Sequence, residues 1–152
     1  MTARVILLVE DSPDDRDLTL RALKRANVLN PMTIANDGAE ALDYLFGSGA
    51  ADRPRPALIL LDLKLPKVDG IEVLRRIRAD EQTQLIPVVI LTGSREQEDV
   101  MAGYQAGANA YVRKPVSFSD FADVVHTLGM FWLLLNEPVP EFLPAPDRGW
   151  HP

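Results

Sequence analysis

Reactive side chains directly follow four separate apolar runs of this sequence. In chain order they are Glu10 and Asp11, Asp62, Thr92, and Lys114. If the four runs are strands of one parallel sheet, their carboxyl ends share an edge and these side chains meet in one pocket. Each alone has an ordinary explanation, such as a helix cap or a surface ion pair. Four strand ends of this kind together favour a functional site.

The residue types in this predicted pocket suit phosphoryl chemistry. Three crowded carboxylates repel one another, so at least one should have a raised pKa unless cations neutralise them. Lys114 supplies one positive charge, and Mg²⁺ is a hard ion that accepts a few carboxylates while keeping several waters. A carboxylate beside such an ion can accept a phosphoryl group, since aspartyl phosphates are known covalent intermediates. Lys114 and the Thr92 hydroxyl could then hold the phosphoryl oxygens.

Short aliphatic runs alternate with amphipathic stretches along most of the chain. The runs predict five strands, at 5–9, 32–35, 58–61, 87–91 and 109–113. Helical spacing of apolar residues follows each run, although the face within 96–106 is poor, and 47–56 is rich in Gly, Ala and Pro, as in a surface loop. This alternation predicts an α/β fold, a doubly wound five-stranded parallel sheet with helices on both faces.

Composition sets outer bounds on function. The chain has 152 residues, which suits one domain with a real core, and it has no cysteine, which excludes disulfides and thiol catalysis. A net charge of −6 argues against a nucleic-acid-binding surface. The first apolar run, 5–9, is too short for a signal peptide or a membrane span, so we expect a cytoplasmic protein without membrane contacts.

The motifs together resemble the receiver domain of two-component response regulators. They are Glu10-Asp11, Leu61-Asp62-Leu63, the segment 65–70 (Leu-Pro-Lys-Val-Asp-Gly), Leu91-Thr92-Gly93 and Arg113-Lys114-Pro115. The resemblance covers residues 4–128 and implies a CheY-like, flavodoxin-like sheet in the order 2-1-3-4-5. The loop 47–56, the segment 65–70 and the apolar carboxyl extension are similar to those of single-domain regulators paired with bacterial phytochromes.

The resemblance implies a role for each matching residue. Asp62 would accept a phosphoryl group from a sensor histidine kinase, in a reaction that the protein itself catalyses, together with the later dephosphorylation. Glu10, Asp11, Asp62 and the backbone carbonyl of Lys64 would hold Mg²⁺. Thr92 and Lys114 would bind the phosphoryl group, with a cis 114–115 peptide, and Thr92 and Tyr111 would form the switch. Gly93 stands where the family more often has Ala, and Lys64 could form an ion pair within the pocket.

The carboxyl extension, residues 129–152, predicts a dimer. Its first part, 129–136, is apolar on all sides, and 137–144 is a proline-spaced arm. Because one domain can cover only one side of an apolar helix, we expect a symmetric homodimer. The predicted interface residues are Phe121, Val125, Leu128, Phe131, Trp132 and Leu135. The alternative is an arm that folds back over its own domain. No basic recognition helix is evident.

Three other classes of protein deserve comparison. A haloacid-type phosphatase would place a second acid two residues after Asp62, where this chain has Lys64. A flavodoxin-type carrier needs a phosphate-binding loop after the first strand, where Glu10 and Asp11 would repel phosphate. A scaffold or dimerisation module that is never phosphorylated remains the principal alternative, and only a phosphorylation experiment separates it from a receiver.

Overall fold

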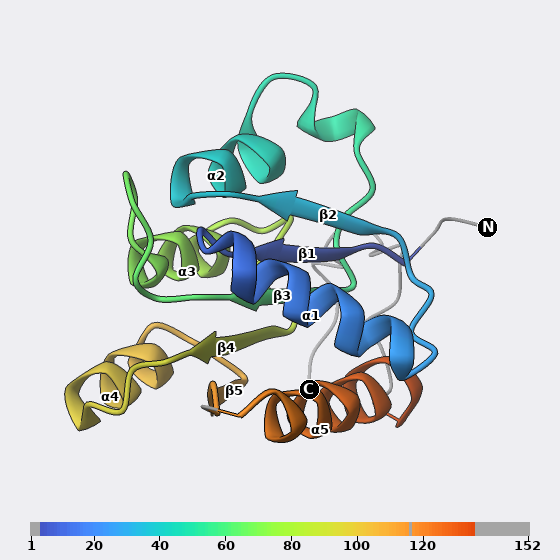
Figure 1. Cartoon of the computed structure of the whole chain (residues 1–152). Helices are drawn as coiled ribbons and strands as arrows, with labels where there is room; N and C mark the ends of the chain where they lie inside the picture. The colour runs from blue at the N-terminus through green and yellow to red at the C-terminus, as the bar shows by residue number, and fades with distance from the viewer. Residues whose placement is uncertain (1–3, 116, 136–152) are drawn as a thin grey trace, which may run out of the picture.

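Five short strands form one parallel sheet in the order β2-β1-β3-β4-β5 (Figure 1). The computed structural model describes residues 4–115 and 117–135. The strands are β1 (Ile6–Val9), β2 (Met32–Ala35), β3 (Leu58–Leu61), β4 (Val88–Thr92) and β5 (Ala110–Arg113). Val9 pairs with both Ala35 and Leu61, and Leu61 pairs with Ile90. The predicted sheet and its strand order are therefore confirmed.

Helices cover both faces of this sheet, as predicted. They are α1 (Pro13–Arg25), α2 (Gly38–Phe46), α3 (Gly70–Ala79), α4 (Gln97–Gln105) and α5 (Phe118–Gly129), with a 3₁₀ turn η1 (Ala50–Asp52) inside the 47–56 loop and a π-helical segment η2 (Met130–Leu135) after α5. Helices α1 and α5 lie side by side on one face, and α2 and α3 cover the other (Figure 1).

The alternation of side chains along each strand produces two hydrophobic cores. In β3, Ile59 and Leu61 face the α2–α3 layer, whereas Leu58 and Leu60 face the α1–α5 layer. All four side chains are buried, which explains why the strand sequence has no polar interruption. By contrast, α4 buries only Gly103, in keeping with its poor apolar face.

Short polar side chains begin four helices just beyond the strand ends. Ser12, Asp37, Asp69 and Ser117 are the N-caps of α1, α2, α3 and α5, and each accepts a hydrogen bond from the backbone N–H three residues later. These caps satisfy otherwise unpaired donors and fix where the chain leaves the sheet. The carboxyl edge of the sheet is therefore surrounded by well-defined helix starts.

The end of the described chain corrects part of the predicted dimer interface. Phe121 and Val125 are buried in the α1–α5 core, so a partner chain cannot reach their side chains and the prediction is wrong for these two. Phe131 is exposed, and Leu128 and Trp132 are half-buried. The side chain of Leu135 and the proline-spaced arm lie outside the described residues. Among the helices that are described, none has the length and apolar character needed to cross a membrane.

Candidate functional site

The carboxyl ends of four strands bring the predicted side chains to one edge of the sheet. Glu10 and Asp11 follow β1, Asp62 follows β3, Thr92 ends β4 and Lys114 follows β5. The sheet's hydrogen-bond ladder extends into these positions: the Asp62 N–H donates to the Val9 carbonyl at 3.1 Å, and the Lys114 N–H donates to the Thr92 carbonyl at 2.8 Å. The backbones of Asp62 and Lys114 are thereby held by neighbouring strands.

Three carboxyl groups form a cluster suited to a cation. One oxygen from each of Glu10, Asp11 and Asp62 lies within 4.8 Å of the others. Glu10 and Asp62 are buried, whereas Asp11 is exposed at the rim. Oxygen ligands crowded at this spacing suit a hard divalent ion that keeps some of its waters, because the exposed side leaves room for them. The residues present therefore fit divalent-metal binding.

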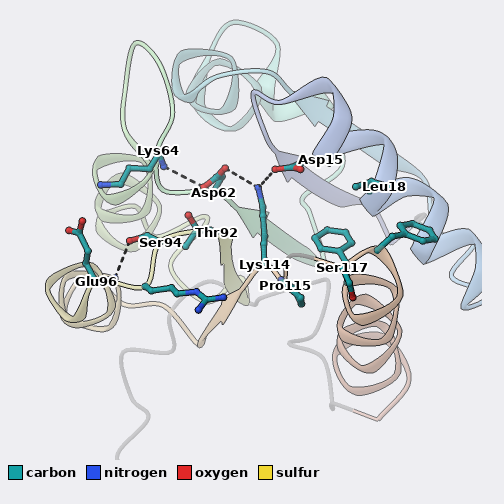
Figure 2. A pocket seen from close by; sticks show the side chains of 14 residues that line it. Asp15, Leu18, Asp62, Lys64, Thr92, Ser94, Glu96, Lys114, Pro115 and Ser117 are labelled. Carbon is teal, nitrogen blue, oxygen red and sulfur yellow. Dashed lines mark hydrogen bonds and ion pairs between the residues drawn. The ribbon is translucent and has the colours of Figure 1, made fainter.

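Lys114 binds this acidic edge with a nearly buried ammonium group. Its Nζ pairs with the carboxylates of Glu10, Asp15 at 2.9 Å and Asp62 at 3.1 Å. Only 10% of the Lys114 side chain is exposed, so solvent screens these ion pairs weakly. Figure 2 shows the ammonium group between Asp62 and Asp15. The sequence predicted the meeting of Lys114 with Glu10 and Asp62, but not the contact with Asp15.

The pKa values of the two buried carboxyl groups, Glu10 and Asp62, are shifted in opposite directions. Burial raises the pKa of Glu10 to about 7, and the negative charge of Asp62 adds to this, against the opposing effect of Lys114. Burial also acts to raise the pKa of Asp62, but the charge of Lys114 and hydrogen bonds to its carboxylate outweigh burial and leave that pKa lowered. Asp62 is therefore the ionised member of the pair at neutral pH. The carboxylates raise the pKa of Lys114 in spite of its burial.

A cleft of about 810 Å³ opens beside Asp62 and gives access to it. Asp62, Thr92, Gly93 and Lys114 line the cleft. Leu18 of α1 and Phe118 and Phe121 of α5 also line it. Thr92, the last residue of β4, borders this cleft although it is almost fully buried. A small anion can therefore approach both the Asp62 carboxylate and the Lys114 ammonium group.

Beside the cleft, the predicted switch residue Tyr111 is tied to the loop after β4. Its hydroxyl donates to the Ser94 carbonyl at 3.2 Å. The Ser94 hydroxyl donates in turn to the Asp99 carboxylate of α4, which also pairs with the Lys64 ammonium at 3.3 Å. The loop that follows Thr92 is thus connected to β5, to α4 and to the loop after β3.

One possibility left open by the sequence is decided here, and one expectation needs correction. Lys64 lines the cleft, but its ammonium points away from Asp62 and pairs with Asp99 of α4 (Figure 2). The predicted cis peptide between Lys114 and Pro115 is wrong, since no cis bond occurs among the described residues. Proline lowers the preference for trans to about 0.5–1 kcal/mol but does not reverse it.

Sequence reasoning also missed Asp15 and Asp99. Asp15 belongs to the first turn of α1, where an acid has a sufficient explanation in the helix dipole. Its position gave one usable signal, because a helix that starts immediately after β1 must place its first turn above the strand ends. Asp99 gave none, since the loop between β4 and α4 sets its position.

Comparison with known proteins assigns the family. Residues 6–126 match the sequence profile described as "Response regulator receiver domain", which is most of the chain. The chain belongs to this family. Receiver domains take a phosphoryl group from histidine kinases and have autophosphatase activity, so the family relation supports a part in two-component signalling.

Individual receivers support the relation to phytochrome regulators. Response regulator Rcp1 of Synechocystis is 42% identical over 131 residues, which is 86% of this chain and 89% of Rcp1. The crystal structure of its Mn²⁺-bound form has a TM-score of 0.84 at 40% identity and covers 90% of this chain and 99% of that one. The phosphorylated cyanobacterial phytochrome response regulator RcpA has a TM-score of 0.85 at 38% identity, with the same two coverages. The bacteriophytochrome response regulator AtBRR is 51% identical, with a TM-score of 0.69 over 90% of this receiver and 100% of AtBRR.

Proposed function

We propose that this protein is a single-domain response regulator that accepts a phosphoryl group on Asp62 from a sensor histidine kinase, with Mg²⁺ as cofactor. The observation that carries the proposal is the ionised Asp62 carboxylate at the cleft, beside the Lys114 ammonium at 3.1 Å and next to two further acids. The similarity to RcpA and AtBRR supports a phytochrome-type kinase as the donor.

Each residue of the site has a distinct part in this reaction. An Asp62 oxygen attacks the phosphorus of a phosphohistidine; the P–O bond forms as the P–N bond breaks, and the imidazole leaves. Lys114 and the Thr92 hydroxyl bind the oxygens of the transferred group. Glu10, Asp11, Asp62 and the Lys64 carbonyl would hold Mg²⁺, which supplies positive charge against the phosphoryl oxygens. Because all these groups belong to one chain, the protein catalyses its own phosphorylation and dephosphorylation.

The signal would then pass from Thr92 to the surface through Tyr111. Thr92 moves toward the phosphoryl group, the loop holding Ser94 follows, and the hydrogen bond from the Tyr111 hydroxyl moves with it. The output is a protein–protein contact in the cytoplasm rather than contact with nucleic acid or a membrane. In this proposal residues 4–128 are the receiver domain, and 129–152 form a dimerisation extension.

A small phosphodonor tests the proposal without the kinase. We expect the full-length protein with acetyl phosphate and Mg²⁺ to gain the mass of one phosphoryl group, and Asp62→Asn to gain none, because an amide is not a nucleophile for this reaction. Asp17→Asn, which removes the same charge from an exposed position on α1, should gain it normally. A wild-type protein that gains no mass at any Mg²⁺ concentration would instead be the scaffold module.

We also propose that the partner at the carboxyl extension is a second copy of this chain. Phe131 is 49% exposed and packs edge-on against Trp132, with ring centroids 5.0 Å apart, while Leu133 points into the core. Apolar side chains on both sides of one helical turn favour coverage by another molecule. Phe131→Glu should sediment as a monomer under conditions where wild type is a dimer. Met101→Glu, at an exposed site on α4, should leave the dimer intact. A monomeric wild type would refute this partner.

A further inference from the structure

The carboxylate of Asp15 contacts the phosphate-binding lysine of the proposed function but belongs to none of the strand ends. Asp15 lies in the first turn of α1, three residues after the cap Ser12, whose hydroxyl accepts a hydrogen bond from the Asp15 N–H at 3.3 Å. The Asp15 carbonyl also accepts a hydrogen bond from the Thr19 hydroxyl at 2.8 Å. The backbone of Asp15 is therefore fixed, and its side chain points at the cleft (Figure 2).

All three donors of the Lys114 ammonium have acidic partners. An ammonium group has three N–H donors and no acceptor. Glu10, Asp15 at 2.9 Å and Asp62 at 3.1 Å account for them, and Asp62 is the most distant of the three. A phosphoryl oxygen can therefore accept a hydrogen bond from Lys114 only if one of these three carboxylates weakens or loses its own hydrogen bond.

Of the three carboxylates that contact Lys114, Asp15 is the one outside the acidic cluster. Glu10 and Asp62 belong to the cluster that fits a cation, whereas Asp15 does not. Asp15 and Asp62 bind the same nitrogen, so the distance between their two binding oxygens cannot exceed the sum of the 2.9 Å and 3.1 Å ion-pair distances. A phosphoryl group on Asp62 would thus lie close to the negative charge of Asp15. This carboxylate is 37% exposed, so solvent reduces the repulsion without removing it.

We propose that Asp15 is a positioning residue that competes with the phosphoryl group for the Lys114 ammonium and so favours the unphosphorylated state. The inference rests on the proposed function, because it assumes that a phosphoryl group arrives at Asp62. It assigns to α1 a part in setting how readily this receiver becomes phosphorylated. The competition requires both the negative charge and the direct contact with Lys114.

The test compares two neighbouring aspartates of the same helical turn. Asp15→Asn and Asp14→Asn remove the same charge from the first turn of α1, and Asp14 is exposed. The probe is fluoroberyllate with Mg²⁺, which mimics a phosphoryl group on a carboxylate, and its dissociation constant is measured by fluorine NMR on the full chain. We expect Asp15→Asn to bind it roughly fivefold or more tightly than wild type, and Asp14→Asn to stay within about twofold.

Two further readouts separate competition from a purely structural effect. Asp15→Asn should lower the half-saturating concentration of acetyl phosphate, whereas Asp15→Glu, which keeps the charge and the acceptor, should return it toward the wild-type value. High salt should abolish any effect of Asp14→Asn, because that effect is long-range and exposed, but only part of the Asp15→Asn effect.

The outcomes distinguish this inference from the proposed function. A wild type that binds fluoroberyllate, with Asp15→Asn no tighter than Asp14→Asn, would overturn the inference alone. An Asp15→Asn variant that binds more weakly than wild type would also overturn it, since Asp15 would then be an anchor that phosphoryl binding needs. A wild type that neither binds fluoroberyllate nor gains mass from acetyl phosphate would overturn the proposed function first.

Discussion

Lys114→Met should slow phosphorylation by acetyl phosphate at least about 100-fold, the usual cost of removing one preorganised donor from a transition state. The ammonium group is the one cation within ion-pair distance of Asp62 among the described residues. Without it, the carboxylate loses the charge that keeps its pKa low, and the transferred oxygens lose their fixed partner. The measurement is the rate of mass gain at a fixed concentration of acetyl phosphate.

The same substitution should also destabilise the fold in a pH-dependent way. Removing one partner of a buried ion pair typically costs about 3–5 kcal/mol, because the other charge stays buried without compensation. In the variant, the pKa of Asp62 should rise above its value in the unfolded chain, and the pKa of Glu10, which is already raised, should rise further. The native state then binds more protons than the unfolded state, so its stability falls as the pH rises from 5 to 8.

Urea unfolding at the two pH values, with and without Mg²⁺, checks this expectation. The loss relative to wild type should be smaller at pH 5, and Mg²⁺ should restore part of the stability at pH 8, since a cation again neutralises the cluster. Arg113→Met removes the same charge from the neighbouring exposed position of β5 and should have little effect on either measurement. Equal losses at both pH values would contradict the role assigned to Lys114.

Gly38→Ala should destabilise the protein by about 2 kcal/mol or more, against the expectation from helix propensity. Gly38 is the first residue of α2, and alanine in place of glycine inside a helix normally stabilises by about 1 kcal/mol. Here a Cβ would overlap the carbonyl oxygen of Val68 and lie 2.7 Å from its carbonyl carbon. Backbone atoms cannot rotate away, so either α2 or the loop after β3 must move.

Gly93→Ala is the matched control for that prediction. A Cβ on Gly93 would meet nothing within 4 Å. Its free energy of unfolding should stay within about 0.5 kcal/mol of the wild-type value in urea titrations. A Gly38→Ala variant that unfolds at higher urea concentration than wild type would show that the close approach of α2 to Val68 is not a constraint.

The two glycines illustrate which features could be found without coordinates. Gly38 lies against Val68 in the loop after β3. Nothing in the local sequence distinguishes it from a glycine at a helix start that could be replaced by alanine without a clash. Asp15 and Asp99 were missed for the same reason, since their partners Lys114 and Lys64 are far away in the chain. The buried positions of Phe121 and Val125 also depend on packing against α1, which a pattern of apolar residues does not specify.

Apolar periodicity along the chain was sufficient to predict the sheet, its parallel strands and the convergence of Glu10, Asp62 and Lys114. Strand periodicity is local, and a parallel sheet places every carboxyl end at the same edge, so the meeting of these residues follows from topology alone. The ion pairs could be assigned only from the packed structure. Lys114 also binds Asp15, Lys64 pairs with Asp99, and Glu10 rather than Asp62 has the raised pKa. Such outcomes depend on ångström-scale distances and burial, because electrostatic energy changes steeply with both.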